Sequence, residues 1–423
     1  MSLSHQTDRD LLLALFHTAV TSAMPGQAIL PHLPPAPRGR TVVVGAGKAA
    51  AQMARALEAN WPGPLSGVVV TPYGHGVPCN IVEVLEAAHP VPDAAGHLAS
   101  QRLLHAVTGL SPEDLVISLI SGGGSALLPS QAPGLTLQDE QALNVALLAS
   151  GAPIGAMNII RSQVSTIKGG RLAQQAAPAP VVTLIISDIP GDDASLVASG
   201  PTIPFDAQRQ TARRLITELK LNLPEGLKAF LDSEDNLPPA PDDPIFSRNT
   251  NQIIASARHS LEAAARQARA AGIETLILSD AIEGDARVIG GMHAAITREL
   301  ARPQSRINRP LLVLSGGETS VAPSGNGKGG RNSELLLALA QGIEGLTNIV
   351  ALAADTDGKD GTSSAAGGFV DGTTIRRLRA SGLDPQVLLE TSDTASGLLQ
   401  IGDLIETGPT GTNVNDFRAI LIR

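Results

Sequence analysis

The sequence predicts an α/β protein made of two α/β domains. At 423 residues the chain is long for one hydrophobic core, which favours two domains. Short apolar segments alternate with segments of helical periodicity, as in a sheet whose strands are joined by helices. Most of the apolar segments are followed directly by glycine and charged residues. Open α/β sheets bind ligands at the ends of their strands, so these loops are the candidates for function.

Composition argues against several classes of partner. The net charge is −9 and aromatic residues make up 2% of the chain, which disfavours nucleic-acid binding. The first residues lack a basic start, and no stretch approaches the roughly 20 apolar residues of a membrane span. We therefore expect a cytoplasmic protein without a membrane partner. The single cysteine, Cys79, excludes an intrachain disulfide and a multi-cysteine metal site.

Helix and strand signals alternate through the first half of the chain. A Rossmann-like, three-layer domain with a mostly parallel sheet is expected over residues 1–240. The expected helices are 8–21, 48–58, 93–107 and a broken helical segment at 136–177, and the expected strands are 41–44, 67–71, 115–120 and 181–186.

The second half begins after a proline-rich stretch at 238–244, which has the composition of a linker. A second α/β domain is expected over residues 241–423. The expected strands are 252–255, 274–278, 311–314, 348–353 and 419–422, and the expected helices are 256–271, 285–301 and one that begins near Asn332.

The first expected strand ends in Gly45-Ala46-Gly47, and Lys48 follows at the start of a helix. This pattern is also that of the GxGxxA fingerprint of dinucleotide-binding proteins. The fingerprint requires an acidic residue about 20 positions later, at the end of the next strand, and none follows 67–71. A lysine suits a phosphate group better than a nicotinamide. A phosphate-binding turn is therefore favoured over an NAD(P) site.

Two later strands end in similar turns of small residues. One is the SGGGS turn at 121–125, and the other is the SGG turn at 315–317 with Glu318 at its end. A second glycine cluster carries Lys328 and leads to Arg331 at the start of a helix. Glycines let backbone N–H groups approach a ligand closely, and a helix N-terminus adds partial positive charge. These loops are expected to bind anions, although mobile surface loops would have the same composition.

Lysine is concentrated beside glycine, where an ammonium group can meet phosphate as a point charge. Four of the six lysines have a glycine neighbour, namely Lys48, Lys168, Lys328 and Lys359. Just before Gly169-Gly170, polar residues recur at spacings of three and four, which places them on one helix face. They are Asn158, Arg161, Ser165 and Lys168. A ligand site and a solvated helix face explain this stripe equally well.

Carboxylates follow two of the other expected strands. Asp188 comes just after 181–186, where a ligand is expected, and a turn or capping aspartate is the alternative. The acidic loop at 355–362 carries Asp355, Asp357 and Asp360. It fails the EF-hand pattern because the acceptor at position five and the glutamate at position twelve are missing. Three carboxylates so close together still suit Mg²⁺.

Charges of both signs in these loops favour phosphoryl transfer. Cations offset the charge of the migrating group, while carboxylates hold Mg²⁺ or accept the proton of the substrate hydroxyl. Acyl transfer would need a nucleophile paired with a base, and no convincing pair is present. His75 and His89 lie in loops and are interpreted as solvated or capping residues. P-loop, GxSxG and HExxH motifs are missing.

The motifs together resemble those of the class II glycerate 2-kinase family, whose members are often labelled hydroxypyruvate reductases. The resemblance covers nearly the whole chain. It implies transfer of the γ-phosphoryl group of ATP to the 2-hydroxyl of D-glycerate with Mg²⁺ or another divalent cation, in the cleft between two α/β domains. The motifs are, in order, GAGKA (45–49), SGGGSALL (121–128), KGGRLA (168–173), SDIPGDD (187–193), SGP (199–201), SGGET (315–319), GGRNSE (329–334), DTDGKDGT (355–362) and TGPTGTNVND (407–416).

The resemblance also implies roles for individual residues. Lys48 and Arg331 match the cationic pair of the family. Lys48 would contact the transferred phosphoryl group or the substrate, and Arg331 would bind the carboxylate or stabilise the transition state. Asp188, Glu318 and Asp357 are candidate metal ligands, and Asp188 is also a candidate catalytic residue. The expected substrate- and nucleotide-binding residues are Gly47, Ser121, Gly122, Gly123, Ser125, Lys168, Ser315, Gly316, Gly317, Glu318, Lys328, Asn413 and Asn415.

Two other functions stay open at this stage. An NAD(P)H-dependent reductase of hydroxypyruvate is supported by the GxGxxA pattern and weakened by the missing acidic residue. A non-catalytic protein that binds anions or sugar acids is disfavoured by the repeated carboxylate-bearing loops. The kinase hypothesis predicts that Lys48→Ala and Arg331→Ala each remove most activity without unfolding the protein. One departure from the family pattern is Ser333, where glutamine is usual. Assembly into a homo-oligomer is left open.

Overall fold

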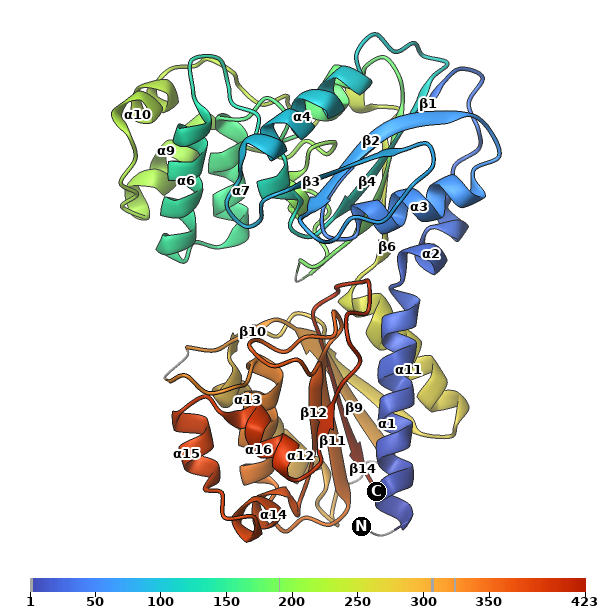
Figure 1. Cartoon of the computed structure of the whole chain (residues 1–423), viewed down its shortest axis with the longest axis vertical. Helices are drawn as coiled ribbons and strands as arrows, with labels where there is room; N and C mark the ends of the chain where they lie inside the picture. Colours follow the sequence, from blue (N-terminus) through green and yellow to red (C-terminus); the bar gives the residue numbers. More distant parts are fainter. Residues whose placement is uncertain (1–2, 190, 306–307, 323–324) are drawn as a thin grey trace. The chain divides into compact units, whose positions relative to one another are not determined.

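The computed structural model describes residues 3–189, 191–305, 308–322 and 325–423, so Pro190 of the predicted SDIPGDD motif lies outside them. Contacts divide the chain into two compact units (Figure 1). We call Pro25–Ile254 the middle unit, and Met1–Met24 together with Ala255–Arg423 the terminal unit. The sequence placed a single boundary at 240/241. The observed division differs because the first helix of the chain belongs to the terminal unit and most of the strand near 252–255 belongs to the middle unit.

The middle unit is built on a six-stranded sheet with strand order β3-β2-β1-β4-β5-β6. β1 pairs in parallel with β2 and β4, and the pairs β2–β3 and β4–β5 are also parallel. This is the strand order of a Rossmann fold, in which the order reverses between β1 and β4. The strands are β1 (Thr41–Ala46), β2 (Leu65–Pro72), β3 (Glu83–Ala87), β4 (Leu115–Ser121), β5 (Val181–Ile186) and β6 (Thr250–Ala255).

Helices pack on this sheet because successive strand residues point to opposite faces. Val42 and Val44 of β1 share a core cluster with Leu103 of α4 and Leu172 of α8. Val43, between them, is also fully buried, and α3 contacts β1, β2 and β4. The α-helices are α2 (Pro25–Ala28), α3 (Ala50–Asn60), α4 (Ala94–Ala106), α5 (Gly124–Leu127), α6 (Leu137–Ser150), α7 (Ile154–Gln163), α8 (Arg171–Ala176), α9 (Arg209–Glu218) and α10 (Glu225–Asp232), and the 3₁₀ helices are η1 (Leu30–His32), η2 (Val197–Ser199) and η3 (Pro244–Phe246).

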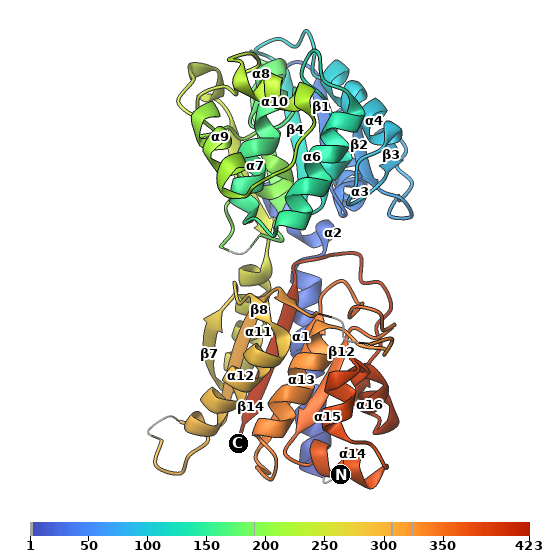
Figure 2. The ribbon, with the colours of Figure 1, turned by 90° about the vertical axis from the view of Figure 1, so that its left-hand side faces the viewer.

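The terminal unit has a six-stranded mixed sheet with strand order β13-β12-β11-β14-β9-β7. Its strands β7, β12 and β14 are labelled in Figure 2. β7 and β9 are parallel, and the other pairs in this sheet are antiparallel. The strands of this sheet are β7 (Glu274–Ser279), β9 (Leu311–Gly317), β11 (Ile349–Asp355), β12 (Gly367–Asp371), β13 (Leu404–Ile405) and β14 (Asp416–Ile422). β8 (Gly284–Asp285) and β10 (Thr319–Ser320) pair in a separate two-stranded sheet. The helices are α1 (Leu3–Ser22), α11 (Ala257–Ala270), α12 (Ala286–Leu300), α13 (Arg331–Gly342), α14 (Thr374–Ala380), α15 (Pro385–Glu390) and α16 (Thr394–Gln400).

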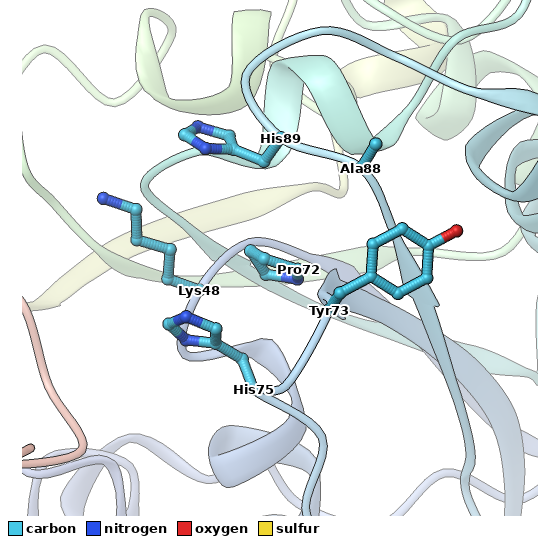
Figure 3. Close-up of a pocket in the computed structure, with 6 residues that line it drawn as sticks. All are labelled: Lys48, Pro72, Tyr73, His75, Ala88 and His89. Carbon is cyan, nitrogen blue, oxygen red and sulfur yellow. The ribbon is translucent and has the colours of Figure 1, made fainter.

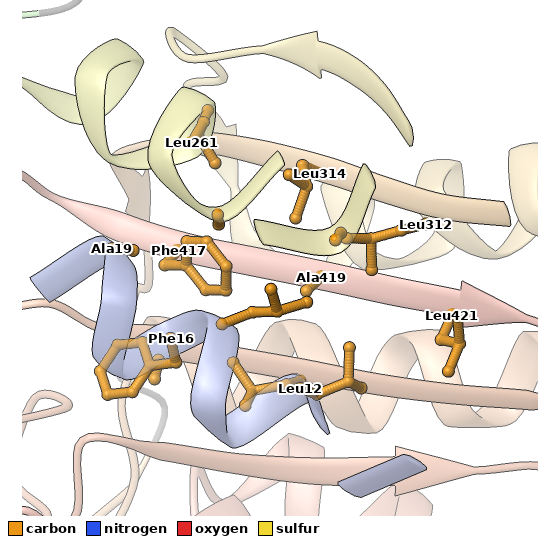
Figure 4. Packing of buried hydrophobic residues seen from close by; sticks show 14 of the residues in the cluster. Leu12, Phe16, Ala19, Leu261, Leu312, Leu314, Phe417, Ala419 and Leu421 are labelled. Carbon is orange, nitrogen blue, oxygen red and sulfur yellow. The ribbon is translucent and has the colours of Figure 1, made fainter. Parts of the chain in front are cut away.

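Alternate residues of these strands serve two separate cores. Leu312 and Leu314 of β9 belong to the core that α1 and α11 cover. Leu311 and Val313 belong to the opposite core, which α12 and α13 cover together with the three last helices. Figure 4 shows Phe16 and neighbouring apolar side chains of α1 packed beside β14. The terminal unit is therefore a three-layer sandwich that needs the first helix of the chain to close one face.

A buried charge cluster fixes α1 to this unit. Arg9 is 5% exposed and bonds Asp403 at 2.7 Å and Asp371 at 3.2 Å. Arg377 pairs with the same two carboxylates, and the Arg9 guanidinium lies 5.3 Å from the ring centre of Phe369. Buried charges are costly when they lose their partners, so α1 is held by charge as well as by apolar packing. The sequence could not show this contact, because Arg9 and Asp403 lie 394 positions apart.

The predicted strands are present, and several extend further than predicted. The helical signal at 136–177 consists of the three helices α6, α7 and α8. The helix predicted at 93–107 is α4, and Asp93 caps it with its carboxylate 2.9 Å from the amide of Gly96. The sequence analysis missed β3 and β12. β3 is an edge strand with little buried surface, and β12 begins with two glycines, which have low strand propensity.

We expect Leu15→Ala to lower the free energy of unfolding of the terminal unit by about 2–5 kcal/mol, because Leu15 is fully buried and its removal leaves a cavity. Leu399→Ala is the matched control, since Leu399 on α16 is 63% exposed. Denaturant titration followed by circular dichroism measures both changes. An unchanged midpoint for Leu15→Ala would contradict the place of α1 in this core.

Candidate active site

The predicted residues gather in two groups, one in each unit. In the middle unit, Lys48 follows β1, the SGGGS turn at 121–125 follows β4 and Asp188 follows β5. These strands are parallel neighbours, so their carboxyl ends lie at one edge of the sheet. This edge includes the point where the strand order reverses, which is where open α/β sheets bind ligands.

A pocket with a volume of about 290 Å³ opens beside Lys48. Figure 3 shows the Lys48 ammonium and two imidazole rings directed toward the same space. The Tyr73 hydroxyl points away from it and donates a hydrogen bond to Asp93 at 2.7 Å. With one cation and two titratable rings, the pocket suits an anion. Its lining residues are Lys48, Pro72, Tyr73, His75, Ala88 and His89.

The backbone of the Lys48 turn makes its hydrogen bonds inside the protein. The amide of Gly47 donates to a β2 carbonyl, and that of Lys48 donates to the Gly122 carbonyl at 2.9 Å. The amide of Ala49 donates to Ser121 Oγ at 2.9 Å, and Ser121 is 2% exposed. A dinucleotide fingerprint uses such amides for the pyrophosphate. This turn instead offers a ligand only the Lys48 side chain, and the ligand roles predicted for Gly47 and Ser121 are not supported by their contacts.

In the SGGGS turn at 121–125, glycines are needed because side chains from other loops approach the backbone closely. A β-carbon on Gly122 would overlap the Asp188 carboxylate, and one on Gly123 would lie 3.0 Å from His89 Nε2. Gly123 also has a φ of 80°, which favours glycine. The turn thus holds Asp188 and His89 directly against its backbone. Ser125, at the end of the turn, is hydrogen-bonded to another serine hydroxyl at 2.8 Å.

Lys168 lies in a buried polar network away from solvent. Its side chain is 1% exposed, and the ammonium bonds Glu140 and the Leu128 carbonyl, each at 2.8 Å. Burial lowers the pKa of Lys168, although the charge of Glu140 acts in the opposite direction. Arg161 belongs to the same interior and donates to Asn144 at 2.9 Å. The predicted stripe is therefore neither a ligand site nor a solvated face, and the ligand role predicted for Lys168 is not supported.

In the terminal unit, Arg331 at the start of α13 is held by three carboxylates. It donates to Asp416 at 2.8 Å, to Glu318 at 2.7 Å and to Asp355 at 2.6 Å. Strand register brings these groups together, because Asp416 pairs with Asp355 on one side and with Gly317 on the other. Sequence analysis did not select Asp416, since its position beside Asp355 depends on how the last strand pairs.

The three carboxylates control the charge and orientation of Arg331. Burial lowers its pKa, but the charges of Asp416, Asp355 and Glu318 outweigh this effect and raise the pKa above its ordinary value. Burial and the charge of Asp416 raise the pKa of Asp355, although the charge of Arg331 acts in the opposite direction. The Arg331 side chain is still 22% exposed. Three of the five guanidinium N–H groups serve these bonds, so two are left for a ligand.

The glycine cluster before Arg331 packs against backbone. A β-carbon on Gly327 would overlap the backbone near Asp393. The amide of Lys328 donates to the Asp393 carboxylate at 2.8 Å, and the amide of Gly329 donates to Thr362 at 3.2 Å. These N–H groups are committed to the protein, so a backbone cradle for an anion is not supported here. The Lys328 side chain is exposed.

The SGG turn at 315–317 is also used for packing. Ser315 is 2% exposed and hydrogen-bonded to His293 Nε2 at 2.9 Å. The other ring nitrogen of His293 faces a carbonyl, so it carries the proton and Ser315 is the donor. The Gly316 carbonyl accepts from Arg418, and a β-carbon on Gly317 would overlap the backbone of Ile282. The ligand roles predicted for these three residues are therefore not supported by their contacts.

The acidic loop does not act as one set of three carboxylates. Asp360 is 1% exposed and accepts from the amides of Asn332 and Ser333, each at 2.9 Å, so it caps α13. Ser333 also donates its hydroxyl to Asp360 at 2.8 Å, which gives the residue that departs from the family pattern a structural role. Asp357 is half-buried and accepts from the amide of Lys359 at 2.8 Å. Among the residues that the structure describes, no three His, Cys, Asp or Glu side chains are grouped as metal ligands.

The predicted polar loop before β14 is tied to its surroundings. Asn413 accepts from the amide of Asn415 at 3.0 Å, and the Asn415 carbonyl accepts from Thr356 at 2.7 Å. Asn415 has a φ of 64°. Thr412 donates to the carbonyl of Ala23 at 2.8 Å. Asn413 is half-buried and lies three residues before Asp416 of the Arg331 group, so its predicted role stays open.

The sequence analysis missed His75 and His89 as pocket residues. Both follow strand ends, His75 after β2 and His89 after β3. Lys48 and Asp188 were selected because residues that follow a strand end often bind ligands. The same rule, applied to every strand of the sheet, selects both histidines. It did not reach His89 because β3 itself was missed.

Comparison with known proteins places the chain in a family. Residues 11–232 match the model of a domain of unknown function, DUF4147, and residues 311–416 match the MOFRL family model. A D-glycerate 2-kinase from Thermotoga maritima is 36% identical over 411 residues, which cover 96% of this chain and 97% of that protein. The chain belongs to the class II glycerate 2-kinase family.

Structure and further relatives agree with this family. The crystal structure of a glycerate kinase from Thermotoga maritima has a TM-score of 0.91 at 35% identity and covers 99% of this chain and 100% of that chain. The predicted architecture of two α/β domains is thereby confirmed. A protein of Agrobacterium vitis named "Putative hydroxypyruvate reductase" is 47% identical over 425 residues, which cover 100% of this chain and 96% of that protein. Within the described residues, no helix has the length and apolar character needed to cross a membrane.

We expect Lys168→Met to lower the free energy of unfolding of the middle unit by about 3–5 kcal/mol, because it leaves the buried Glu140 carboxylate without its partner. Lys228→Met is the control, since the Lys228 side chain is 43% exposed and its ion pair lies at the surface. Both variants are compared by denaturant titration. If Lys168→Met changed stability no more than the control, the buried pair would be contradicted.

Proposed function

We propose that this chain transfers the γ-phosphoryl group of ATP to the 2-hydroxyl group of D-glycerate. Relatives named glycerate 2-kinase from Thermotoga maritima and Pyrococcus horikoshii, 36% and 37% identical, support the kinase class. The placement of Lys48 carries the proposal. Its ammonium is directed toward the pocket, while the amides of its turn are bonded inside the protein. The turn thus supplies a point charge for a phosphoryl group and not a cradle for a dinucleotide.

Lys48 and the SGGGS turn would act together on the migrating group. In phosphoryl transfer, charge is spread over the three equatorial oxygens of that group, and a fixed cation nearby stabilises it. Lys48 is half-buried, so its charge acts in surroundings less polar than water. Gly123 allows a close approach at the same point, because its α-carbon carries no side chain between Lys48 and the neighbouring ring.

Mg²⁺ is proposed to arrive with the nucleotide. This ion keeps several waters and uses one or two protein carboxylates beside phosphate oxygens, so it needs no cage of protein ligands. Asp188 and Asp357 fit this requirement, since both are half-buried at strand exits. Glu318 is the weaker candidate because it already pairs with Arg331. When bound, the ion would neutralise charge on the phosphate oxygens.

Arg331 is proposed to bind an anionic group of the substrate. Its two remaining N–H groups suit the planar carboxylate of D-glycerate, or an oxygen of the phosphoryl group. The three carboxylates hold the guanidinium in one orientation before any ligand binds. Such preorganisation reduces the cost of ordering the site.

Reduction of hydroxypyruvate with NAD(P)H is the second candidate, and it is considered because of the name of the Agrobacterium vitis relative. The strand order of the middle unit would suit a dinucleotide. Two observations stand against it: β2 runs into Pro72, Tyr73 and Gly74 with no acidic residue for the ribose, and the turn amides are occupied. Kinase activity is therefore the better supported function.

We expect Lys48→Met to lower kcat for D-glycerate phosphorylation at least about 100-fold, because it removes a charge that stabilises the transition state. Its thermal unfolding should match the wild type, since the Lys48 side chain is only half-buried and lines a pocket. ADP release measures the rate, and oxidation of NAD(P)H with hydroxypyruvate is followed in parallel. Reductase turnover without ADP release would contradict the kinase proposal.

Arg331→Lys is expected to lower kcat/KM for D-glycerate about 10- to 1,000-fold, because lysine keeps the charge but loses the fork of N–H donors. This variant is preferable to Arg331→Ala, which would leave the buried Asp355 carboxylate without its cation and lower stability. Arg302→Lys is the control, since the Arg302 side chain is 65% exposed. A kcat/KM for Arg331→Lys equal to that of the control would contradict a role for Arg331 in substrate binding.

A further inference from the structure

His89 lies beside Lys48 in the pocket. The proposed function gives roles to Lys48 and Asp188 but none to the His89 side chain. It follows β3, and its ring rests on the SGGGS turn, where a β-carbon on Gly123 would lie 3.0 Å from His89 Nε2 and 3.5 Å from Lys48 Cγ. Figure 3 shows the imidazole and the Lys48 ammonium directed into the same pocket from neighbouring loops. An acceptor for a proton and a fixed cation therefore share one space.

The surroundings of His89 favour its neutral form. Partial burial and then the charges of Lys48 and His75 lower the pKa of His89 below its ordinary value of about 6.5. These two residues face it from the loops after β1 and β2, and Asp188 lies beside the neighbouring Gly122. Tyr73, which also lines the pocket, is bonded to a carboxylate. A neutral imidazole has one ring nitrogen that can accept a proton.

We propose that His89 is a further catalytic residue, which accepts the proton of the substrate hydroxyl as this oxygen attacks the γ-phosphorus of ATP. The inference rests on the proposed function. The hydroxyl oxygen forms the new P–O bond, the bond from the γ-phosphorus to the bridging oxygen breaks, and its electron pair leaves with ADP. The hydroxyl proton moves to the unprotonated ring nitrogen of His89 and passes to water after turnover.

The other titratable groups near the pocket are less suited to this step. His75 is exposed on the loop after β2, whereas the ring of His89 is held close to Gly123 of the SGGGS turn. Asp93 is occupied by the Tyr73 hydroxyl and by the amide of Gly96. Asp188 is proposed to hold Mg²⁺, which would bind the lone pairs that a base needs. His89 combines a free ring face on the pocket with contact to the turn.

The test is the pH dependence of D-glycerate phosphorylation by the full chain, with wild type compared with His89→Gln. His105→Gln is the matched control, since His105 is an exposed histidine at the end of α4. We expect His89→Gln to lower kcat about 100-fold or more, the usual effect of losing a general base. The KM values for D-glycerate and ATP should stay within about threefold, because the proton moves only in the transition state.

The pH profile separates this role from a structural one. The active enzyme has neutral His89, so wild-type kcat/KM should fall as the pH drops through the pKa of His89, below about 6.5. His89→Gln should lack this acid limb, and His105→Gln should retain it. Calorimetric binding of Mg-ATP should be alike in all three proteins.

Each outcome decides between the two proposals. If the wild type forms phosphoglycerate and His89→Gln retains both kcat and the acid limb, the role of His89 is overturned and the kinase function stands. Weaker Mg-ATP binding with unchanged kcat would make His89 a binding residue and also overturn its role as a base. If the wild type forms no phosphoglycerate, both proposals fail. Should His89→Gln not fold, His89→Asn takes its place in the same measurements, and a kcat and acid limb like those of the wild type would overturn the inference.

Discussion

The hydrogen bonds that tie the Lys48 turn to the neighbouring strand limit what the middle unit can bind. β1 and β4 lie side by side in parallel, and the amides that follow β1 are taken by Gly122 and Ser121 at the end of β4. In a dinucleotide-binding fold, amides at this point receive the pyrophosphate. Here the same strand order leads to a different kind of site, in which a lysine side chain and two histidines face the ligand space.

Buried charges determine much of the remaining architecture. Arg9 holds the first helix on the terminal unit, Lys168 joins two segments inside the middle unit, and Arg331 collects three carboxylates at the end of a sheet. Each of these cations pairs with buried carboxylates, and leaving such a carboxylate in the interior without its cation would lower the stability of the fold. Of these three side chains, that of Arg331 is the most exposed, at 22%. Burial thus separates the two structural cations from the one that we propose to bind substrate.

Sequence patterns were most informative where a local rule determines position. A strand followed by small and charged residues marks a sheet edge, and this rule correctly brought Lys48, the SGGGS turn and Asp188 to one edge. The same patterns could not distinguish a buried lysine from a ligand-binding one, because spacing along a helix does not show which face is covered. Lys168 was misjudged for this reason.

Other features depend on pairing between distant segments. Asp416 joins Arg331 through the register of β14, and α1 joins the terminal unit through Arg9 and an apolar stripe. No local signal encodes either contact. The glycines were likewise ambiguous, since those at 327 and 317 allow backbone to pack against backbone, whereas that at 123 allows two side chains to approach a turn. Both kinds of turn are rich in glycine, so their composition does not show which of the two a given turn is.

The most direct test of the account is ³¹P NMR of the product formed from D-glycerate and Mg-ATP. The account predicts 2-phosphoglycerate and ADP in equal amounts, formed only with Mg²⁺ and lost in Lys48→Met. A 3-phosphoglycerate signal would contradict the proposed position of transfer. Intact ATP, with NAD(P)H consumed when hydroxypyruvate is added, would contradict the assignment of the Lys48 pocket to phosphoryl transfer.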